Sequence, residues 1–323
     1  MNPLRRKLVC GTAALLAATA SLAADPFPNR PIKFVANTAP GGLLDAHARV
    51  IAQEMSKVLG QPIVVDNRTG ADGLIGIRAV KTAAPDGYTV LVSANTFAQN
   101  PALKNDIGYD VAKDFIGLGM ISSYPLILIT ATSHPEKSMA EVIARAKANP
   151  GKMTFSSGGV GTSTHMAGAM FLSHAGINML HVPYKGNAAG APDVLAGRIN
   201  INFDGANAVL PHVKEGRLRA LGVTTAKRSA SFPDIPTLAE LGLPNYNYTA
   251  YTGLMLPAGT PKDVVQKLHQ ALQVALKSDA ARERLRHDGA EPASMSPEEF
   301  TRFLQDDEKR IAKVAQDLNL QKQ

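Results

Sequence analysis

The stretches Ala39–Asp45 (APGGLLD) and Ser156–His165 (SSGGVGTSTH) decide how this chain folds. Each follows a short apolar run and leads into a segment with helical periodicity, so each predicts a strand that turns through glycines into a helix. Such a turn leaves backbone N–H groups free at the positive end of the helix dipole. The two turns therefore predict two anion-binding positions that could hold a ligand carboxylate from opposite sides.

Strands alternate with helices along the rest of the chain, which indicates an α/β fold. The helix after the first turn has an apolar face and is expected to end at Gly60, with Pro62 beyond it. Further helix starts are expected at Ser138 and Ser296, and roughly the last 65 residues should be mainly helical. Strands are expected at residues 32–36, 63–65, 88–92, 126–130, 153–156, 178–182, 198–203, 218–223 and 251–256.

The first residues predict export through a cleaved signal peptide. Arg5–Lys7 is basic, Leu8–Leu22 is apolar or small, and Ser21–Ala23 fits a small-x-small cleavage site. The apolar stretch of about 15 residues is shorter than the roughly 20 that span a membrane. We expect residues 1–23 to be removed, with Ala24 as the alternative last residue. The single cysteine, Cys10, lies in this segment, so the mature chain would have no disulfide and no thiol chemistry.

Charge and composition limit the kinds of binding partner that this chain is expected to have. The formal net charge of +7 falls to about +4 when Arg5, Arg6 and Lys7 leave with the signal peptide. The remaining basic residues are scattered and aromatic residues make up only 5%, so we expect no nucleic-acid partner. No later stretch is apolar enough to span a membrane. A mature chain of about 300 residues is expected to form two domains.

Several short segments, in order along the mature chain, are similar to the Bug proteins, the substrate-binding components of tripartite tricarboxylate transporters. Any one of them would be a weak signal, whereas the whole series is specific. The segments are Phe27–Lys33, Pro40–Asp45, Val65–Arg68, Ala84–Thr89, Ser156–His165, His181–Gly186, Phe203–Asp204, Leu218–Leu221, Pro233–Thr237 and Pro257–Pro261.

This resemblance implies a type II-like periplasmic binding protein with two α/β lobes and a ligand cleft between them. Lobe 1 would comprise residues 24–125 plus 248–323, and lobe 2 residues 126–247. The implied function is to capture a small organic carboxylate (a di- or tricarboxylate or an aromatic acid) and deliver it to the transporter membrane subunits. The resemblance implies no enzyme activity, no metal and no cofactor, and we expect a monomer.

In the family a ligand carboxylate sits across the two glycine turns, held by main-chain N–H groups, hydroxyls and bridging waters. The residues that match these positions are Gly41, Gly42, Ser157, Gly158, Gly161, Thr162 and, as an acceptor near the cleft, Asp204. The chain departs from the pattern in two places. Asn37, Thr38 and Ala39 stand where an aromatic residue is common, and Leu44 replaces a Ser or Thr, so Asn37 and Thr38 are expected to supply polar contacts instead.

Other candidates have two readings that the sequence leaves open. Gly41 and Gly42 could serve only a tight turn, and Asp45 could simply favour the helix dipole. Asn95 follows a strand and either faces the cleft or forms a turn. His165 is expected to pack or form hydrogen bonds rather than to catalyse. Tyr184 either lines the pocket or packs in the core.

An enzyme and a sensor are the rival classes. A hydrolase is disfavoured because neither Ser157 nor Ser163 lies in a Gly-x-Ser-x-Gly elbow. The eight histidines lack the spacing of a metal site, and Gly159–Thr164 lacks the lysine of a phosphate loop. A protein that reports ligand binding to a membrane sensor kinase needs the same closing cleft as an uptake protein, so it remains the alternative to uptake.

Overall fold

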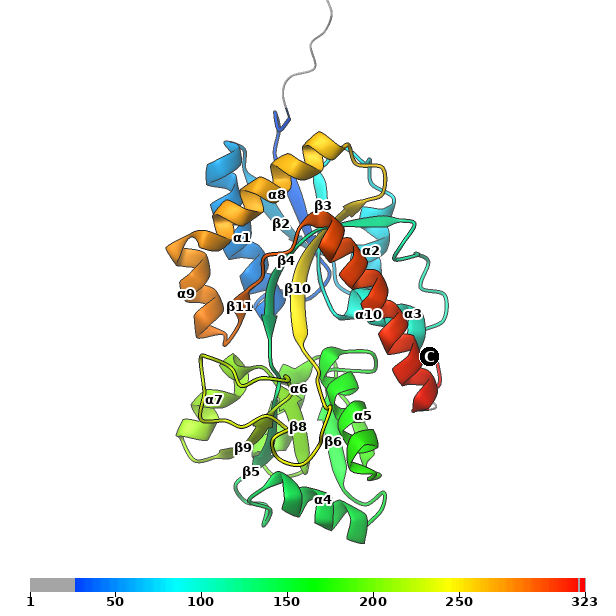
Figure 1. Ribbon diagram of the computed structural model, residues 1–323, viewed down its shortest axis with the longest axis vertical. Helices are drawn as coiled ribbons and strands as arrows, with labels where there is room; N and C mark the ends of the chain where they lie inside the picture. Colours follow the sequence, from blue (N-terminus) through cyan, green and yellow to red (C-terminus); the bar gives the residue numbers. More distant parts are fainter. Residues whose placement is uncertain (1–26, 319, 323) are drawn as a thin grey trace, which may run out of the picture.

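The computed structural model describes residues 27–318 and 320–322, so the expected signal peptide and Cys10 lie outside the described residues. Two sheets, one above the other in Figure 1, define two lobes. The strands of the lobe 1 sheet, in spatial order, are β11 (Glu291–Pro292), β4 (Phe115–Tyr124), β10 (Ala250–Pro257), β3 (Thr89–Ala94), β1 (Ile32–Ala36) and β2 (Ile63–Asn67). Those of lobe 2 are β7 (Leu180–Pro183), β6 (Thr154–Ser157), β8 (Ile201–Asp204), β5 (Ile127–Ala131) and β9 (Leu218–Val223).

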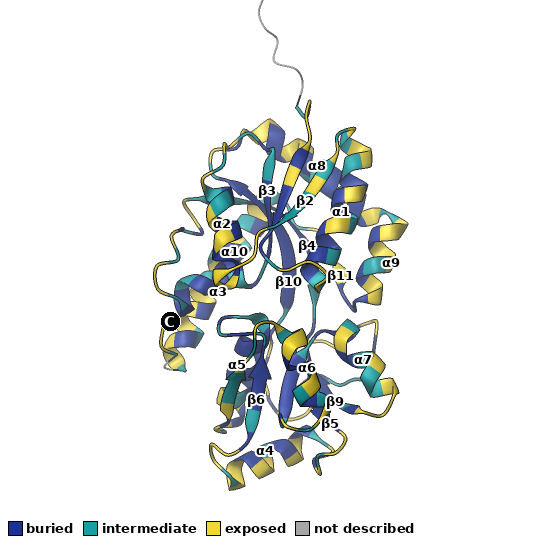
Figure 2. Ribbon diagram, turned by 180° about the vertical axis from the view of Figure 1, so that it is seen from behind, coloured by how far each residue is buried: buried dark blue, intermediate teal, exposed yellow. Residues whose placement is uncertain are grey.

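Helices cover both faces of each sheet (Figures 1 and 2). On lobe 1, one face carries α1 (Leu43–Leu59), α8 (Lys262–Lys277) and α9 (Asp279–His287), and the other carries α2 (Leu74–Lys81), α3 (Thr96–Leu103) and α10 (Pro297–Asp317). On lobe 2, one face carries α4 (Met139–Ala148) and α5 (Ser163–Ala175), and the other carries α6 (Asn187–Leu195) and α7 (Ala206–Lys214). The short η2 turn (Ala71–Gly73) precedes α2.

The chain passes between the sheets twice. It leaves lobe 1 between Tyr124 and Ile127, and it returns between Val223 and Ala250. The two α/β lobes confirm the expected fold class, while the division at residues 125/126 and 247/248 stays a prediction. Within residues 27–318 and 320–322, no helix is long and apolar enough to cross a membrane.

Both glycine turns lie where their sequences predict. β1 pairs in parallel with β2 and β3, and its carboxyl end leads into α1. β6 pairs in parallel with β7 and β8, and its carboxyl end leads into α5. α1 buries Leu44, Ala48, Ile51 and Met55 and ends at the left-handed Gly60 (φ 68°), whereas Val58, expected on the apolar face, is 46% exposed.

Candidate functional site

The first turn is exposed, but one of its amides already has an acceptor. Gly41 has φ +84°, a left-handed backbone that favours glycine. Its N–H donates to Asp45 Oδ2 (3.0 Å), and Asp45 also accepts from Arg49 Nε (3.0 Å) and Asn67 Nδ2 (2.9 Å). Burial opposes ionisation of Asp45, but these hydrogen bonds outweigh it and lower its pKa. Asp45 therefore stabilises the turn and occupies the Gly41 N–H, while the expected ligand contact of Gly41 stays a prediction.

The amides that remain available follow Gly41. The N–H groups of Gly42, Leu43 and Leu44 have no acceptor among the described residues, because they start a helix whose N-cap makes no side-chain bond. The Leu44 side chain is 6% exposed in the lobe 1 core, so this position offers only its N–H. Leu43, which sequence reasoning missed, faces lobe 2: a Cβ placed on Gly205 would lie 3.8 Å from its Cδ1.

Asn37 and Thr38 lie under the first turn. Asn37 is 3% exposed and donates from Nδ2 to Ser93 Oγ (2.9 Å). Its Oδ1 and the buried Thr38 Oγ1 have no hydrogen-bond partner among the described residues. These unpaired polar atoms fit the expectation that polar contacts replace an aromatic residue here, although both are enclosed by protein.

The second turn also uses most of its predicted donors internally. Gly158 N donates to Thr164 Oγ1 (3.0 Å), Gly161 N to His165 Nδ1 (3.3 Å), and Thr162 N to Gly159 O (3.2 Å). These three N–H groups thus have internal acceptors, and the expected ligand contacts of Gly158, Gly161 and Thr162 stay a prediction. The N–H groups without an acceptor among the described residues are those of Val160, Ser163 and Thr164.

Two neutral histidines stiffen this turn. The rings of His165 and His181 stack 4.4 Å apart, and His181 Nε2 lies 2.7 Å from Ser157 Oγ. Burial lowers both pKa values to about 4, and for His165 the neighbouring His181 adds to the effect. Both rings are therefore uncharged near neutral pH. The Ser157 hydroxyl, in a residue 1% exposed, accepts from Gly159 N (3.1 Å), and its expected ligand contact stays a prediction.

Asn95 and Tyr184 have internal roles. Asn95 is fully buried; its Nδ2 donates to Thr249 O (3.1 Å), and its Oδ1 accepts from Tyr251 N (2.9 Å) and Ser163 Oγ (3.3 Å). The Tyr184 hydroxyl donates to Asp193 Oδ2 (2.5 Å), and its ring packs over Gly190. These bonds give Asn95 a structural role, whereas Tyr184 is half-buried and belongs to no apolar core cluster among the described residues. Ligand contacts of both residues stay a prediction.

Asp204 ends β8 beside Gly205, where lobe 2 meets Leu43 of lobe 1. Gly205 N donates to Asp204 Oδ1 (2.8 Å). Burial raises the pKa of this carboxyl to about 6, against the effect of hydrogen bonds from Asn187 and Gly205. Asp204 therefore changes charge close to neutral pH, at the junction of the lobes.

The lobes touch at both turns. A Cβ placed on Gly159 would lie 3.9 Å from Asp72 Oδ1, and one placed on Gly161 would lie 3.7 Å from Lys104 Cε. The helix starts of α1 and α5 thus belong to opposite lobes that contact each other. This arrangement suits a small anionic ligand held between them.

Comparison with known proteins decides the family. A family model described as the tripartite tricarboxylate transporter family receptor matches residues 47–320. The chain belongs to this receptor family. BugT of Bordetella pertussis is 35% identical over 323 residues, which cover 98% of each chain.

Solved structures of binding proteins agree with this family. The periplasmic binding protein BugD has a TM-score of 0.83 at 31% identity, covering 92% of this chain and 100% of its own. The R. palustris protein Rpa4515 with adipate has a TM-score of 0.84 at 32% identity, covering 91% and 98%. The family is one of periplasmic binding proteins rather than enzymes.

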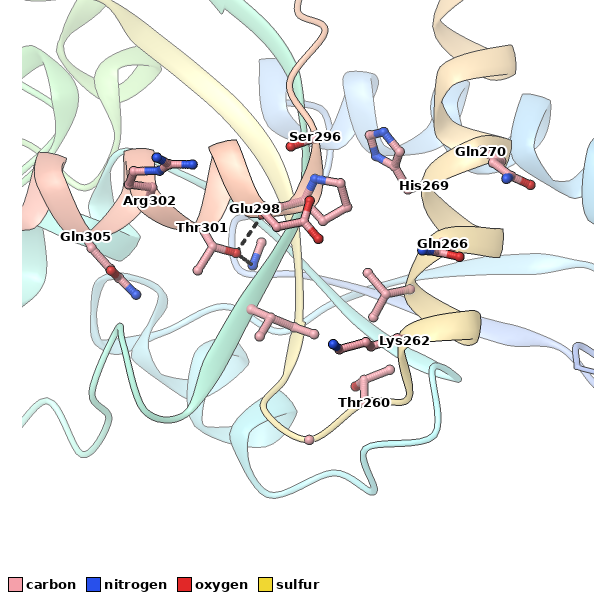
Figure 3. A pocket seen from close by; sticks show the side chains of 15 residues that line it. Thr260, Lys262, Gln266, His269, Gln270, Ser296, Glu298, Thr301, Arg302 and Gln305 are labelled. Carbon is pink, nitrogen blue, oxygen red and sulfur yellow. Dashed lines mark hydrogen bonds between the residues drawn. The ribbon is translucent and has the colours of Figure 1, made fainter.

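A groove of about 1040 Å³ on this receptor lies between α8 and α10 (Figure 3), and no residue of either glycine turn lines it. Two of its polar side chains have structural partners. The Thr301 hydroxyl accepts from Gly117 N (2.8 Å), and His269 Nδ1 lies 2.9 Å from Leu118 O. We place the candidate site at the turns, because each start of a helix there lies close to the opposite lobe and carries main-chain donors without an acceptor among the described residues, whereas lobe 1 alone lines this groove.

Sequence reasoning missed Leu43, Asp72, Asn100 and Lys104 as residues of this receptor's interlobe surface. No motif marks them. Lys104 follows α3, and only the folded chain brings it against Gly161, in the other lobe. The one available signal was a lysine that follows a short helix near the end of the first lobe's parallel strands.

Proposed function

We propose that this protein is a periplasmic solute-binding receptor that captures a small organic carboxylate and delivers it to the membrane subunits of a tripartite tricarboxylate-type transporter. The observation that supports the proposal is that two helix N-termini, those of α1 and α5, each lie close to the opposite lobe. A relative of the same fold is described with adipate, which supports a carboxylate ligand.

The proposed carboxylate site differs from the sequence expectation in its donors. The free N–H groups of Gly42, Leu43 and Leu44 would bind from lobe 1, and those of Val160, Ser163 and Thr164 from lobe 2. Gly41 and Gly161 would act indirectly, because their left-handed backbones (φ +84° and +80°) orient the neighbouring N–H groups. Closure would strengthen each contact by excluding water.

A thermal-shift screen of mono-, di- and tricarboxylates and aromatic acids tests the function. A ligand at 100 times its Kd should add about 3 kcal/mol to the free energy of unfolding, which raises the melting temperature. If no carboxylate raises it, the proposal is wrong.

A matched pair of variants tests whether the second glycine turn is part of the binding site. Gly161→Ala and Gly216→Ala both put a side chain on a left-handed backbone (φ +80° and +69°), which costs about 1–2 kcal/mol. Gly216 has nothing within 4 Å and lies outside both turns. Gly161→Ala should lose most of the ligand-induced shift, while Gly216→Ala should keep it. Equal shifts in the two variants would exclude the second turn from the site.

A further inference from the structure

One cation lies close to the second glycine turn. Lys104, the C-cap residue of α3, is only 11% exposed in its side chain and forms an ion pair with Asp72. Its Cε would be 3.7 Å from a Cβ on Gly161. An ammonium this enclosed needs an anionic partner, because leaving it unpaired would cost its desolvation without compensation.

Asp72 can leave this ion pair at low cost, because water can solvate its carboxylate. Its side chain is 48% exposed, and its Oδ1 would be 3.9 Å from a Cβ on Gly159, so it faces the same turn. Asp72 has φ +54° and Ala71 has φ +46°, between Gly70 and Gly73, which are also positive. Non-glycine residues disfavour this backbone. The loop that presents Asp72 is therefore held in a costly conformation next to the interlobe surface.

A second unsatisfied group lies beside the lysine. Asn100 is fully buried, and neither amide atom has a hydrogen-bond partner among the described residues. Its Oδ1 would be 3.8 Å from the same Cβ on Gly161. A buried amide without partners is unusual in a folded protein. An anion that reached Lys104 could also accept a hydrogen bond from the amide nitrogen.

We propose that Lys104 binds a second carboxylate of the ligand, which replaces Asp72 as its anionic partner, and that the ligand is therefore a dicarboxylate. This inference rests on the proposed function. In the exchange the lysine keeps one anionic partner and Asp72 turns to water, so no buried charge is left unpaired. Asp72 is the internal substitute for the ligand when the cleft is open.

Isothermal titration with acids of equal length tests this inference. The pairs are succinate with butyrate, glutarate with pentanoate, and adipate with hexanoate, each measured on the mature protein. The wild type should bind at least one dicarboxylate about 10-fold more tightly than its partner monocarboxylate. Lys104→Gln should weaken binding of that dicarboxylate about 10- to 100-fold and change the monocarboxylate less than about 3-fold.

Two further variants separate a ligand role from a structural one. Asp72→Asn removes the competing carboxylate but keeps a residue that tolerates the left-handed backbone, so it should tighten dicarboxylate binding. Lys81→Gln breaks a comparable ion pair, Lys81 Nζ to Asp114 Oδ2 at 2.9 Å, away from the turns, and should leave the preference unchanged. If Lys104 and Asp72 only tie α3 to η2, both of their variants would lower stability and neither would alter the preference.

The outcomes keep the two proposals apart. Equal binding of both members of every pair by the wild type, or equal losses for both acids in Lys104→Gln, overturns the dicarboxylate inference and leaves the receptor function intact. Binding of none of the acids, by titration and by thermal shift, overturns the receptor function itself.

Discussion

Asp204 is a side chain of the candidate site whose charge changes near pH 6. Its pKa of about 6 results from burial at the end of β8. His165 and His181 titrate near pH 4, so they stay neutral between pH 6 and pH 8. We therefore predict that the Asp204 carboxyl gives binding a pH dependence in this range, because it repels an anionic ligand when ionised and can donate a hydrogen bond when protonated.

We predict that affinity for a fully ionised carboxylate rises about 2- to 5-fold as the pH falls from 8 to 6, because Asp204 becomes half protonated. Titration calorimetry at each pH measures it. Asp204→Asn, which keeps the acceptor for Gly205 N, should make the affinity independent of pH in this range. If the affinity of Asp204→Asn changes with pH as much as that of the wild type, the effect comes from another group.

The same group has a defined effect on the stability of the ligand-free protein. Its folded pKa lies above the ordinary value of 3.8, so its contribution is fully present below pH 3.8 and is lost as the pH rises through about 6. Asp204→Asn should therefore melt at a higher temperature than the wild type at pH 8. If the variant unfolds instead, Asp204 has a structural role rather than a ligand-binding one.

Individual residues also show which features of the site could be predicted from the sequence and which could not. The two glycine turns were predictable because glycine, a preceding strand and a following apolar face form a local pattern. That Asp45, Thr164 and His165 fold back onto the amides of Gly41, Gly158 and Gly161 was not, because side-chain hydrogen bonds within a turn depend on rotamers that no spacing specifies.

At the scale of elements, local signals predicted most of the fold. The bounds of β1 and β9 match residue for residue, and the Ser296 capping box is present in full. At Ser138 only the serine half forms, since Glu141 accepts from Lys137 N instead. Sequence analysis missed β4, the longest strand described, and the two-residue β11. The glycines of β4 hide its pattern, because Gly117 and Gly119 lie where Phe300 and Leu272 leave no room for a side chain.

A buried polar network joins α1 to the two strands that lead toward lobe 2. His47 Nδ1 lies 3.1 Å from Ser122 Oγ on β4 and 3.3 Å from Thr252 Oγ1 on β10. His47 Nε2 lies 3.2 Å from Asp288 Oδ2, and both side chains are fully buried. Asp288 also contacts Arg284 and the exposed His287, and the Tyr124 ring packs edge-on against His47.

We predict that His47→Leu lowers the free energy of unfolding by about 2–4 kcal/mol, because it takes one partner from a buried carboxylate. Urea unfolding measures it. His287→Ala is the matched control: it removes another histidine contact to Asp288, but one that is 71% exposed and worth about 0–1 kcal/mol. Equal losses in the two variants would contradict a structural role for the buried pair.

The network also gives the protein a sensitivity to acid. Burial lowers the pKa of His47 below 6.5, despite the opposing effect of Asp288. Its contribution to stability is present above pH 6.5 and is lost as the pH falls, because the unfolded chain binds the proton more readily. This effect should be absent from His47→Leu.

At the scale of the whole molecule, the lobes are joined along one side by a shared core. Leu103 of α3 and Ile311 of α10 belong to the same apolar cluster as Met166 and Phe171 of α5. Leu43 of α1 comes close to Gly205 of lobe 2 but is not part of that cluster. We therefore expect the lobes to open by rotation about the α3–α10 side, with the first turn and Asp204 moving apart most.

We predict that ligand closes the lobes and that a single interlobe hydrogen bond contributes to closure. Ser163→Ala removes the bond to Asn95 Oδ1 (3.3 Å) and should weaken ligand binding about 2- to 5-fold, because the closed form loses a modest contact. Its free energy of unfolding should change by less than about 1 kcal/mol. Small-angle X-ray scattering should show a larger radius of gyration for the ligand-free variant than for the wild type, and equal radii with saturating ligand.

Asn95→Ala is the companion variant. It also removes the bonds to Thr249 O and Tyr251 N in the strand that returns to lobe 1, so it should lower the free energy of unfolding by about 2–3 kcal/mol. If the Ser163–Asn95 bond contributes to closure, the two variants will differ in stability. Ser163→Ala should change the scattering with little loss of free energy of unfolding. If Ser163→Ala leaves both the radius and the affinity unchanged, closure depends on the ligand alone and not on a contact built into the lobes.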